Sequence, residues 1–322
     1  MKKSRLIAAS ALLAIATAGN AQTLGGRLPT GQWQPGVGLT QIPLWPAGLK
    51  IERRQTSDPE TAWYGHSLVA GKPYQAIVNV SRPTMTIYRP KGRNSGAALL
   101  VFPGGGYEAL AIDLEGSEVC DWATRIGMTC AVLKYRVPQD WHPKSCRPCD
   151  RQPTPFLPLQ DAERAMRLLR QRAASLGIDP RKIGVVGFSA GGHLVTAISN
   201  ATGRSYNPVD AADRLSARPD FAMPIYPGHL WSGQGMALHG YDPVRADAPP
   251  TFIVQAEDDP VDDVRNSISY FLALRAAKVP AEMHIYAHGG HAFGLRPTDQ
   301  PITHWPTLAE QWLRTIGVLQ KP

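Results

Sequence analysis

The sequence has 322 residues, of which 43% are hydrophobic and 19% are charged, which is the composition of a folded globular protein rather than a disordered or fibrous one. The net charge is +8, but three of the basic residues lie within the first five positions, and without them the charge is +5. The remaining lysines and arginines are scattered rather than gathered in a stripe, which argues against a nucleic-acid partner.

The N-terminal segment has the pattern of a secretory signal peptide. Three basic residues precede a short apolar run over residues 6–18, and Gly19-Asn20-Ala21 supplies the small residues of a cleavage site. We therefore predict that residues 1–21 are removed and that the mature protein is exported to the periplasm or the cell exterior. An uncleaved membrane anchor is disfavoured because the run is shorter than the about 20 residues that a bilayer requires, and no other segment is apolar enough to span one.

Two further regions follow the predicted signal peptide. Residues 22–60 are rich in Gly, Pro, Thr and Gln without periodicity, which predicts an extended arm. Residues 61–322 contain no repeat or linker, and from residue 97 onward apolar strands alternate with helices, which predicts one α/β domain with a mostly parallel, doubly wound sheet and no large cap domain. The predicted strands cover 76–80, 84–88, 97–102, 129–135, 183–188, 221–226, 251–255 and 281–286, and the predicted helices cover 114–126, 159–176, 191–200, 264–277 and 305–316.

The helix predicted over 159–176 carries the densest basic run of the chain. Its apolar residues share one face, and Arg164, Arg167, Arg170 and Arg172 lie largely on the other. This pattern predicts a solvated face rather than a binding surface.

Four cysteines indicate disulfide bonding, because an even number in an exported protein is typical of it. Cys146 and Cys149 form a C-x-x-C pair in a proline-rich loop, which predicts a local bridge. A zinc site is disfavoured because no second C-x-x-C and no suitably spaced histidine pair accompany it. Cys120 and Cys130 are predicted to be buried thiols.

The segment Gly187-Phe188-Ser189-Ala190-Gly191 matches the pattern G-x-S-x-G. It lies where a predicted strand ends and a predicted helix begins, which is the context of the nucleophile elbow of α/β-hydrolases. Glycines suit such a tight turn, and the helix start behind the serine supplies backbone N–H groups and a positive dipole end. Ser189 is therefore the predicted nucleophile.

A serine nucleophile requires a base, and in this fold an acid and then a histidine are expected downstream. The acidic segment 257–263 follows the strand predicted over 251–255, and His288 and His291 follow the last predicted strand. All of these loops leave the carboxyl ends of parallel strands, where α/β proteins bind ligands. We predict His291 as the base because two glycines before it allow close approach, and His288 as a turn residue.

Within the acidic segment, Asp259 is the predicted orienting acid, because Asp-Pro-Val is the usual form of this loop, and Asp258 is the alternative. Glu257 is predicted to be a solvated edge residue. Asp262 and Asp263 precede the next helix, where capping and interaction with the helix dipole account for them.

The oxyanion of an acyl-transfer reaction needs its own hydrogen-bond donors. Pro103-Gly104-Gly105-Gly106-Tyr107 follows the strand predicted over 97–102, and its glycines allow backbone N–H groups to come within about 3 Å of the developing charge. We predict that Gly105, Gly106 and Ala190 form the oxyanion hole. A phosphate-binding loop is rejected because neither of its glycine patterns is present.

Several aromatic residues fall near the predicted site. Tyr107, Trp141, Tyr226 and Trp231 lie on loops or strand ends, where they are candidates for a stacking surface that binds a sugar or an aromatic acid, with ordinary packing as the alternative. His193 lies on the helix behind Ser189 and is predicted to pack and to form hydrogen bonds.

Taken in order, these motifs resemble the bacterial acetylxylan/feruloyl esterase-like α/β-hydrolases, also labelled xylanase-like or dienelactone-hydrolase-like. The resemblance covers about residues 40 to 318 and implies a triad of Ser189, Asp259 and His291 that cleaves acyl esters of carbohydrates or other small esters, with no metal or organic cofactor. The motifs that carry it are Leu44-Trp45-Pro46, Pro103-Gly104-Gly105-Gly106-Tyr107, Gly187-Phe188-Ser189-Ala190-Gly191-Gly192-His193, Asp258-Asp259-Pro260-Val261 and Gly289-Gly290-His291-Ala292-Phe293-Gly294.

The sequence departs from its relatives at three points. Related sequences often carry Val-Pro at the positions of Asp262 and Asp263, hormone-sensitive-lipase relatives carry a histidine at the position of Pro103, and true dienelactone hydrolases use a cysteine nucleophile. The rival functions are a general short-chain carboxylesterase, a prolyl-oligopeptidase-like peptidase and a catalytically dead carbohydrate-binding protein. The peptidase is disfavoured because the arm is too short to form a propeller, and the dead protein because the triad is complete.

Overall fold

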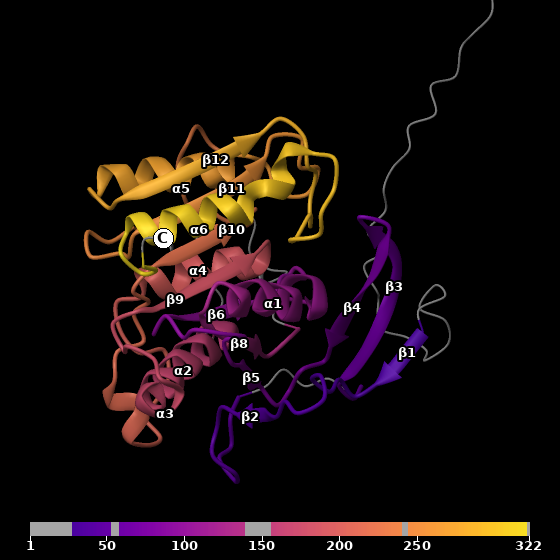
Figure 1. The fold of residues 1–322 in the computed structure, drawn as a ribbon, viewed down its shortest axis with the longest axis vertical. Helices are drawn as coiled ribbons and strands as arrows, with labels where there is room; N and C mark the ends of the chain where they lie inside the picture. The colour runs from indigo at the N-terminus through magenta and orange to yellow at the C-terminus, as the bar shows by residue number, and fades with distance from the viewer. Residues whose placement is uncertain (1–27, 53–57, 139–155, 240–243, 321–322) are drawn as a thin grey trace, which may run out of the picture.

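The computed structural model describes residues 28–52, 58–138, 156–239 and 244–320, and Figure 1 draws the rest as a grey trace. The predicted signal peptide over residues 1–21, the predicted loop bridge between Cys146 and Cys149, and the candidate substrate residue Trp141 all lie outside the described residues. Within the described residues, no helix is long and apolar enough to cross a membrane.

An eight-stranded sheet forms the centre of the protein, in the order β12-β11-β10-β9-β6-β8-β5-β2 (Figure 1). The strands from β12 to β8 in this order run parallel. At one edge, β5 pairs antiparallel with β8, and β2 pairs antiparallel with β5. The predicted α/β-hydrolase class with a mostly parallel sheet is confirmed. The strands are β2 (Gln41–Pro43), β5 (Thr84–Tyr88), β6 (Ala98–Phe102), β8 (Thr129–Lys134), β9 (Ile183–Phe188), β10 (Ala222–Ile225), β11 (Thr251–Ala256) and β12 (Ala281–Tyr286).

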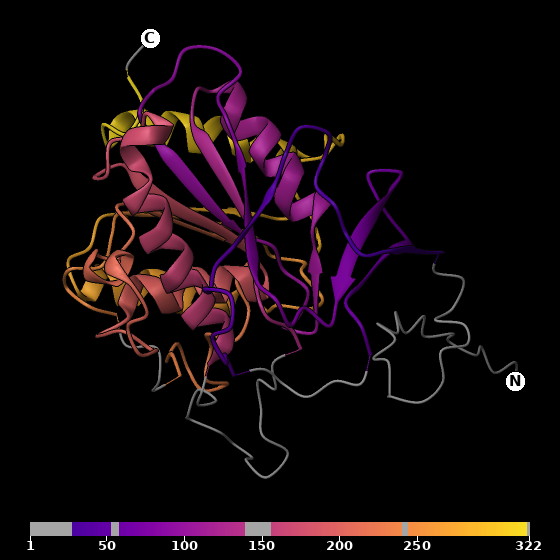
Figure 2. The same ribbon diagram turned by 90° about the horizontal axis from the view of Figure 1, so that it is seen from below.

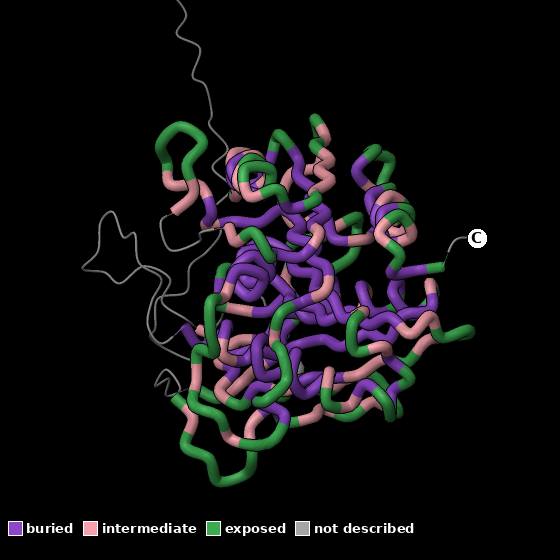
Figure 3. Tube along the Cα trace, turned by 90° about the vertical axis from the view of Figure 1, so that its left-hand side faces the viewer, coloured by how far each residue is buried: buried purple, intermediate pink, exposed green. Residues whose placement is uncertain are grey.

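Helices cover both faces of this sheet (Figure 2). Helices α1 and α6 share one face, where the rings of Trp122 and Trp305 lie 6.0 Å apart. Helices α2, α4 and α5 share the other, where the Asn200 side chain at the end of α4 donates to the Tyr270 hydroxyl of α5. The buried residues in Figure 3 follow the sheet and its inner helix faces. The helices are α1 (Glu118–Arg125), α2 (Leu157–Gln171), α3 (Ala173–Leu176), α4 (Ala190–Asn200), α5 (Arg265–Ala276) and α6 (Trp305–Thr315).

A second, antiparallel sheet stands to the side of the main body, in the order β1-β3-β4-β7 (Figure 1). The two strands predicted over 76–80 and 84–88 are both present, but they belong to different sheets, since the first is part of β4. The long strand β3 was not expected, because Gly65 and polar residues interrupt its apolar pattern. The strands are β1 (Leu28–Gly31), β3 (Thr61–Val69), β4 (Lys72–Val78) and β7 (Ala109–Ala111).

This second sheet supports the glycine loop, residues 103–107, and the segment after it. Strand β7 follows that loop and pairs with β4, and the Asp113 carboxylate accepts the N–H of Gln75 at 2.8 Å. On the other side, the buried Arg296 guanidinium, five residues after His291, donates to the carbonyl oxygens of Val69 and Lys72. The hairpin of β3 and β4 is therefore fastened to two of the loops that carry predicted site residues.

The predicted arm over 22–60 contributes strands to both sheets, since β1 and β2 lie within its described part. Trp45 anchors it further. The Trp45 indole donates to the Asp161 carboxylate of α2 at 2.8 Å, and the Arg136 guanidinium pairs with the same buried carboxylate. The Leu-Trp-Pro motif thus attaches this part of the chain to the core of the domain.

The prediction of a solvated basic face is wrong for Arg164 and Arg167, whereas Arg170 and Arg172 are partly exposed. Arg164 and Arg167 are buried, because the segment that follows α4 folds back over them. Asp210 and Asp213 from that segment pair with Arg164, and Glu163 pairs with Arg167 one turn away. Buried arginines need such partners because an unpaired buried charge is very costly.

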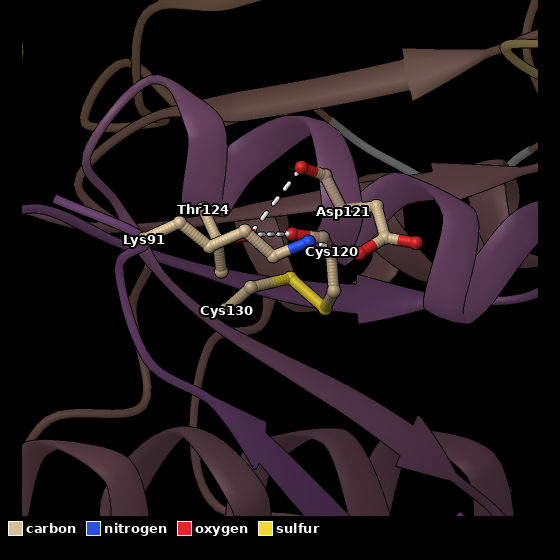
Figure 4. The surroundings of a disulfide bond; sticks show 5 residues. All are labelled: Lys91, Cys120, Asp121, Thr124 and Cys130. Carbon is tan, nitrogen blue, oxygen red and sulfur yellow. Dashed lines mark hydrogen bonds and ion pairs between the residues drawn. A yellow bond between two sulfur atoms is a disulfide. The ribbon is translucent and has the colours of Figure 1, made fainter. Parts of the chain in front are cut away.

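Cys120 and Cys130 form a disulfide bond, which corrects the prediction of two buried thiols (Figure 4). Helix α1 leads directly into β8 and packs against it, so that the Cα atoms of the two cysteines lie 5.3 Å apart. The helical and extended patterns around them gave no sign of this return contact.

We expect the Cys120→Ala, Cys130→Ala double variant to be less stable than the wild type by about 2–3 kcal/mol, because the bond closes a loop of roughly ten residues and restricts the unfolded chain. Denaturant unfolding with and without a reductant measures this. The reductant should lower the free energy of unfolding of the wild type by about this amount more than that of the variant, which keeps Cys146 and Cys149. Equal stability of the two proteins without reductant would contradict the prediction.

Candidate active site

Ser189 occupies a strained turn between β9 and α4, with φ of 51° and ψ of −120°. Only glycine fits two residues before it and two residues after it. A Cβ atom on Gly187 would lie 2.1 Å from the Gly191 carbonyl oxygen, and one on Gly191 would lie 2.1 Å from that of Phe102. This crowding lifts the serine out of the strand and above the sheet edge, as a nucleophile elbow does.

Three loops at this edge bring Ser189, His291 and Asp259 together. Ser189 Oγ lies 3.1 Å from His291 Nε2, and His291 Nδ1 lies 2.8 Å from Asp259 Oδ2. Because an ionised carboxylate only accepts hydrogen bonds, the proton of the neutral imidazole is assigned to Nδ1, which leaves Nε2 to accept the serine proton. The arrangement is that of a serine triad.

The structure distinguishes between the two candidate acids. The Asp259 side chain is fully buried, and its Oδ1 accepts the N–H groups of Val261 and Asp262 at 2.8 and 3.0 Å. Asp258 faces the histidine loop instead, where it accepts the N–H groups of Gly289 and Gly290 at 3.0 and 2.8 Å. Asp259 therefore orients the imidazole, whereas Asp258 fastens the loop that carries it.

His288 takes part in the same fastening, since its Nδ1 lies 3.2 Å from Asp258 Oδ2 while most of its ring is exposed. Its place in the turn agrees with the role expected from the sequence. Among the described residues, no group of three or more His, Cys, Asp and Glu side chains is placed to hold a metal ion.

Negative charge surrounds His291. Burial alone lowers the pKa of its imidazole, but the hydrogen bond to Asp259 and the charges of Asp262, Asp259 and Glu115 outweigh burial and raise the pKa above its ordinary value. The Tyr226 ring packs edge-on against the imidazole at 5.1 Å and limits its contact with water. A raised pKa makes the neutral imidazole a stronger base toward the serine proton.

The glycine loop lies directly against the elbow. A Cβ atom on Gly104 would lie 3.1 Å from Ser189 Cβ, and one on Gly105 would lie 2.2 Å from the Ala109 carbonyl oxygen, so this close approach requires glycine. Gly105 and Gly106 have φ of 133° and 63°. Ala190 is the first residue of α4, where N–H groups have no acceptor within the helix. The assignment of Gly105, Gly106 and Ala190 as oxyanion donors stays a prediction that this placement suits.

Glu115 is a buried member of the site that the sequence analysis missed. Its Oε2 accepts the N–H of Gly104 at 2.7 Å, and its Oε1 accepts the Tyr226 hydroxyl at 2.8 Å. It lies in a π-helical turn, η1 (Asp113–Ser117), within the segment predicted as one helix over 114–126. Burial raises the pKa of this carboxyl group. A glutamate on the apolar face of that helix was the available signal.

Two of the candidate substrate residues present no free face. Tyr107 and Tyr226 are fully buried, and their hydroxyl groups bond His193 Nδ1 at 2.7 Å and Glu115, respectively. The prediction that they line a stacking surface is therefore wrong: both rings support the site from beneath. The packing and hydrogen-bonding role expected for His193 agrees with this contact.

Trp231 is half-buried on the loop after β10. Its indole donates to the Gly235 carbonyl oxygen at 2.9 Å, and the Arg265 guanidinium lies over the ring, 3.5 Å from its centroid. One face of the ring is thus occupied by a cation, so only the remaining exposed part is open to a substrate.

The position of Asp262 corrects the prediction that capping of the next helix accounts for both Asp262 and Asp263. Asp263 behaves as expected at the start of α5, since its Oδ1 accepts the N–H of Arg265 at 2.9 Å. Asp262 instead turns into the site, where its Oδ2 lies 3.2 Å from Ser189 Oγ and 3.8 Å from His291 Nε2. Burial raises the pKa of this carboxyl group to about 6, although the charge of His291 acts in the opposite direction.

Comparison with known proteins agrees with this geometry. Residues 158–315 match the model of the prolyl oligopeptidase family, and residues 85–214 match the model named BD-FAE. An acetylxylan esterase from Xylanibacter ruminicola is 33% identical over 246 residues, which are 69% of this chain and 45% of that protein. An ethyl acetate hydrolase from Pseudomonas putida is 33% identical over 173 residues, which are 50% of this chain and 48% of that protein.

A solved structure extends the comparison over most of the chain. The crystal structure of an acetyl ester-xyloside bifunctional hydrolase from Caldicellulosiruptor lactoaceticus has 31% sequence identity and a TM-score of 0.67, and the match covers 87% of this chain and 97% of that one. The sheet and the elbow at the end of β9 define an α/β-hydrolase. Within that class, the chain belongs to the acetylxylan/feruloyl esterase-like family. It spans less than half the length of each of the two curated relatives named above.

The two aspartates make a matched pair for testing the triad. We expect Asp259→Asn to slow the labelling of Ser189 by a fluorophosphonate on the order of 10³- to 10⁴-fold, because an amide no longer holds Nδ1–H or balances the imidazolium. Asp258→Asn should slow it less than about tenfold, since Asp258 fastens the loop and does not contact the His291 imidazole. Labelling kinetics followed by mass spectrometry measure both, and a larger loss in Asp258→Asn would reverse the assignment.

Asp262 is expected to destabilise the fold at neutral pH. An acid whose pKa rises from its ordinary 3.8 to about 6 on folding opposes folding once it ionises, and this cost is fully present above pH 6 and absent below 3.8. Asp262→Asn should therefore raise the free energy of unfolding by up to about 3 kcal/mol at pH 8 and leave it nearly unchanged at pH 4.

Denaturant unfolding at the two pH values measures this difference. Asp263→Asn is the matched control: its carboxylate is partly exposed, and its ion pair with Arg265 should contribute less than about 1 kcal/mol in the stabilising direction. A lower stability of Asp262→Asn at pH 8 would show that the carboxylate is stabilising, contrary to expectation.

Proposed function

We propose that the protein is a serine carboxylesterase that removes acetyl groups from plant polysaccharides of the xylan type through an acyl-enzyme, after export to the periplasm or the cell exterior. The observation that carries this proposal is the pair of contacts from Ser189 to His291 and from His291 to Asp259, at 3.1 and 2.8 Å, on a strained elbow. That geometry suits attack on a carboxylic ester.

The reaction proceeds in two halves. His291 Nε2 takes the proton of Ser189 as Oγ attacks the ester carbonyl carbon, and Asp259 stabilises the imidazolium. The N–H groups predicted as donors stabilise the tetrahedral oxyanion. The carbon–oxygen bond to the alcohol then breaks, and the alcohol leaves with the proton from Nε2. A water molecule, activated by the same nitrogen, hydrolyses the acyl-enzyme and restores the free serine. Apart from the ester and the water molecule, residues of the chain supply each group that these steps use.

The substrate class and the location rest on separate supports. An acetylxylan esterase and an acetyl ester-xyloside hydrolase are among the proteins that the chain is similar to, which favours acetylated xylan. Export is supported by the signal-like pattern of residues 1–21 and by the disulfide bond between Cys120 and Cys130, because such bonds persist in oxidising compartments.

Three other functions are outcomes of the test. The similarity to an ethyl acetate hydrolase favours a general short-chain carboxylesterase as the second candidate. The match to the prolyl oligopeptidase family model makes a peptidase a further candidate. The third is a carbohydrate-binding protein without activity, and it is disfavoured by the intact contacts of Ser189.

The experiment compares acetate release from acetylated xylan with the hydrolysis of methyl ferulate, a small triglyceride and a prolyl peptide. We expect the wild type to act fastest on acetylated xylan. We expect Ser189→Ala to lower kcat on the order of 10⁴- to 10⁶-fold with the fold intact, because the nucleophile is lost. Circular dichroism checks the fold of the variant.

The possible results separate the candidates. Near-wild-type turnover of p-nitrophenyl acetate by Ser189→Ala would refute the nucleophile assignment. Faster cleavage of the triglyceride or of the peptide would favour the carboxylesterase or the peptidase. An absence of both turnover and fluorophosphonate labelling in the wild type would favour the binding protein.

A further inference from the structure

Asp262 is held in place by contacts with its own loop, with strand β11 and with the loop after β10. Asp259 Oδ1 accepts its N–H, and the Gln255 side chain donates to its carbonyl oxygen at 3.0 Å, so its backbone is fixed by the triad acid and by β11. Its carboxylate lies over Gly228 on the loop after β10, where a Cβ atom would come within 2.3 Å of Oδ1. A side chain at position 228 would therefore displace this carboxylate. Only 13% of the Asp262 side chain is exposed.

The contacts of Asp262 place it on the side of the leaving alcohol. The alcohol oxygen takes its proton from His291 Nε2 and must lie within hydrogen-bond reach of that atom. Asp262 Oδ2 is 3.8 Å from the same nitrogen and 3.2 Å from Ser189 Oγ. A substrate that reacts here thus brings a substituent on the carbon adjacent to its ester-bearing carbon close to this carboxylate.

In the free enzyme the single proton of the Ser189 hydroxyl is shared between two acceptors, Asp262 Oδ2 at 3.2 Å and His291 Nε2 at 3.1 Å. When Ser189 Oγ bonds to the carbonyl carbon, its proton passes to His291, and the serine no longer offers a donor. Asp259 and Glu115 do not meet this difficulty, because backbone or side-chain groups of the protein donate to both oxygens of each. The imidazolium then offsets the charge of Asp262, but its Nε2 lies 3.8 Å away, beyond hydrogen-bond distance. A donor supplied by the substrate would therefore favour the transition state.

We propose that Asp262 determines specificity by accepting a hydrogen bond from a hydroxyl group on the carbon adjacent to the one that bears the ester oxygen, so that the site selects monoesters of vicinal diols, as in a partly acetylated sugar. This inference rests on the proposed esterase function and narrows its substrate class. An alcohol without that hydroxyl leaves the carboxylate unpaired, and sites built to bond a substrate hydroxyl discriminate strongly against analogues that lack it.

The charge of the surrounding groups is consistent with this role. Asp262 is predominantly ionised above its pKa of about 6, and an ionised carboxylate can only accept. The charged or titratable groups that act on it are Asp259, His291 and His193. None of the three is placed between Asp262 Oδ2 and Ser189 Oγ, which are in direct contact.

The test uses three small acetates that differ at one position: trans-2-hydroxycyclohexyl acetate, trans-2-methoxycyclohexyl acetate and cyclohexyl acetate. We expect the wild type to prefer the hydroxyl compound over both others by at least about 100-fold in kcat/KM. Asp262→Val should reduce this preference to less than about fivefold, because the acceptor is gone. The preference is taken as the ratio of kcat/KM values within each variant, so that a change in the basicity of His291 affects all three acetates alike. Asp262→Asn, whose amide oxygen still accepts, should retain an intermediate preference.

Two controls make the result decisive. Asp263→Asn, one residue away and paired with Arg265 outside the site, should keep the wild-type preference. Turnover of p-nitrophenyl acetate by Asp262→Val shows that this variant is folded. If Asp262→Val does not fold, a drop of at least about tenfold in the preference of Asp262→Asn supports the inference instead.

The outcomes that overturn the inference are distinct from those that overturn the proposed function. A wild type that hydrolyses all three acetates equally, or variants at position 262 that keep the full preference, would overturn the role of Asp262 alone. A wild type that hydrolyses none of them, nor p-nitrophenyl acetate, would overturn both.

Discussion

The hydrogen bonds of the Asp259 carboxylate are the interaction on which the rest of the site depends. One oxygen accepts the His291 imidazole and the Gln255 amide, and the other accepts the N–H groups of Val261 and Asp262. The same group therefore orients the base, shapes the loop after β11 and sets the direction in which Asp262 leaves that loop. Because the side chain is fully buried, these contacts are made without competition from water.

The geometry of the loop after β11 explains how Asp259 and Asp262, three positions apart in the sequence, both reach His291. The turn closed by Asp259 reverses the chain, so that Asp259 meets the imidazole at Nδ1 while Asp262 lies 3.8 Å from Nε2. Glu115 adds a third negative charge from beneath the glycine loop. The crowding opposes folding, but it stabilises the imidazolium that forms as Ser189 attacks. Proteins tolerate such local costs mainly where the chemistry requires them.

The parts of this site that depend on local patterns could be predicted from the sequence. Ser189 was placed because a glycine motif between an apolar strand and a helix specifies its own turn, and His291 because two glycines precede it after the last strand. Asp262 could not be placed. At the start of a helix its sequence context is the same as that of Asp263, and only the turn closed by Asp259 sends one side chain inward and the other outward.

The other missed features share this dependence on distant segments. Arg164 was expected to be solvated because nothing on its own helix covers it, and the acids that pair with it come from residues after α4. Cys120 and Cys130 meet only because α1 packs against the strand that follows it. Gly65 interrupts the apolar pattern of β3, and the strand forms because β1 and β4 pair with it on both sides.

The raised pKa of His291 has two opposing effects on the enzyme. A more basic imidazole withdraws the serine proton more readily, but it is neutral only at higher pH, and it returns the proton less readily to the alcohol. The ionised Asp262 beside Nε2 contributes to the raised pKa and therefore strengthens each of these effects. A substrate hydroxyl bonded to Asp262 would draw charge density toward itself and weaken the field at the imidazolium, so that the proton is released more easily as the alcohol departs. Binding of the preferred alcohol and its protonation would thus be coupled through one carboxylate.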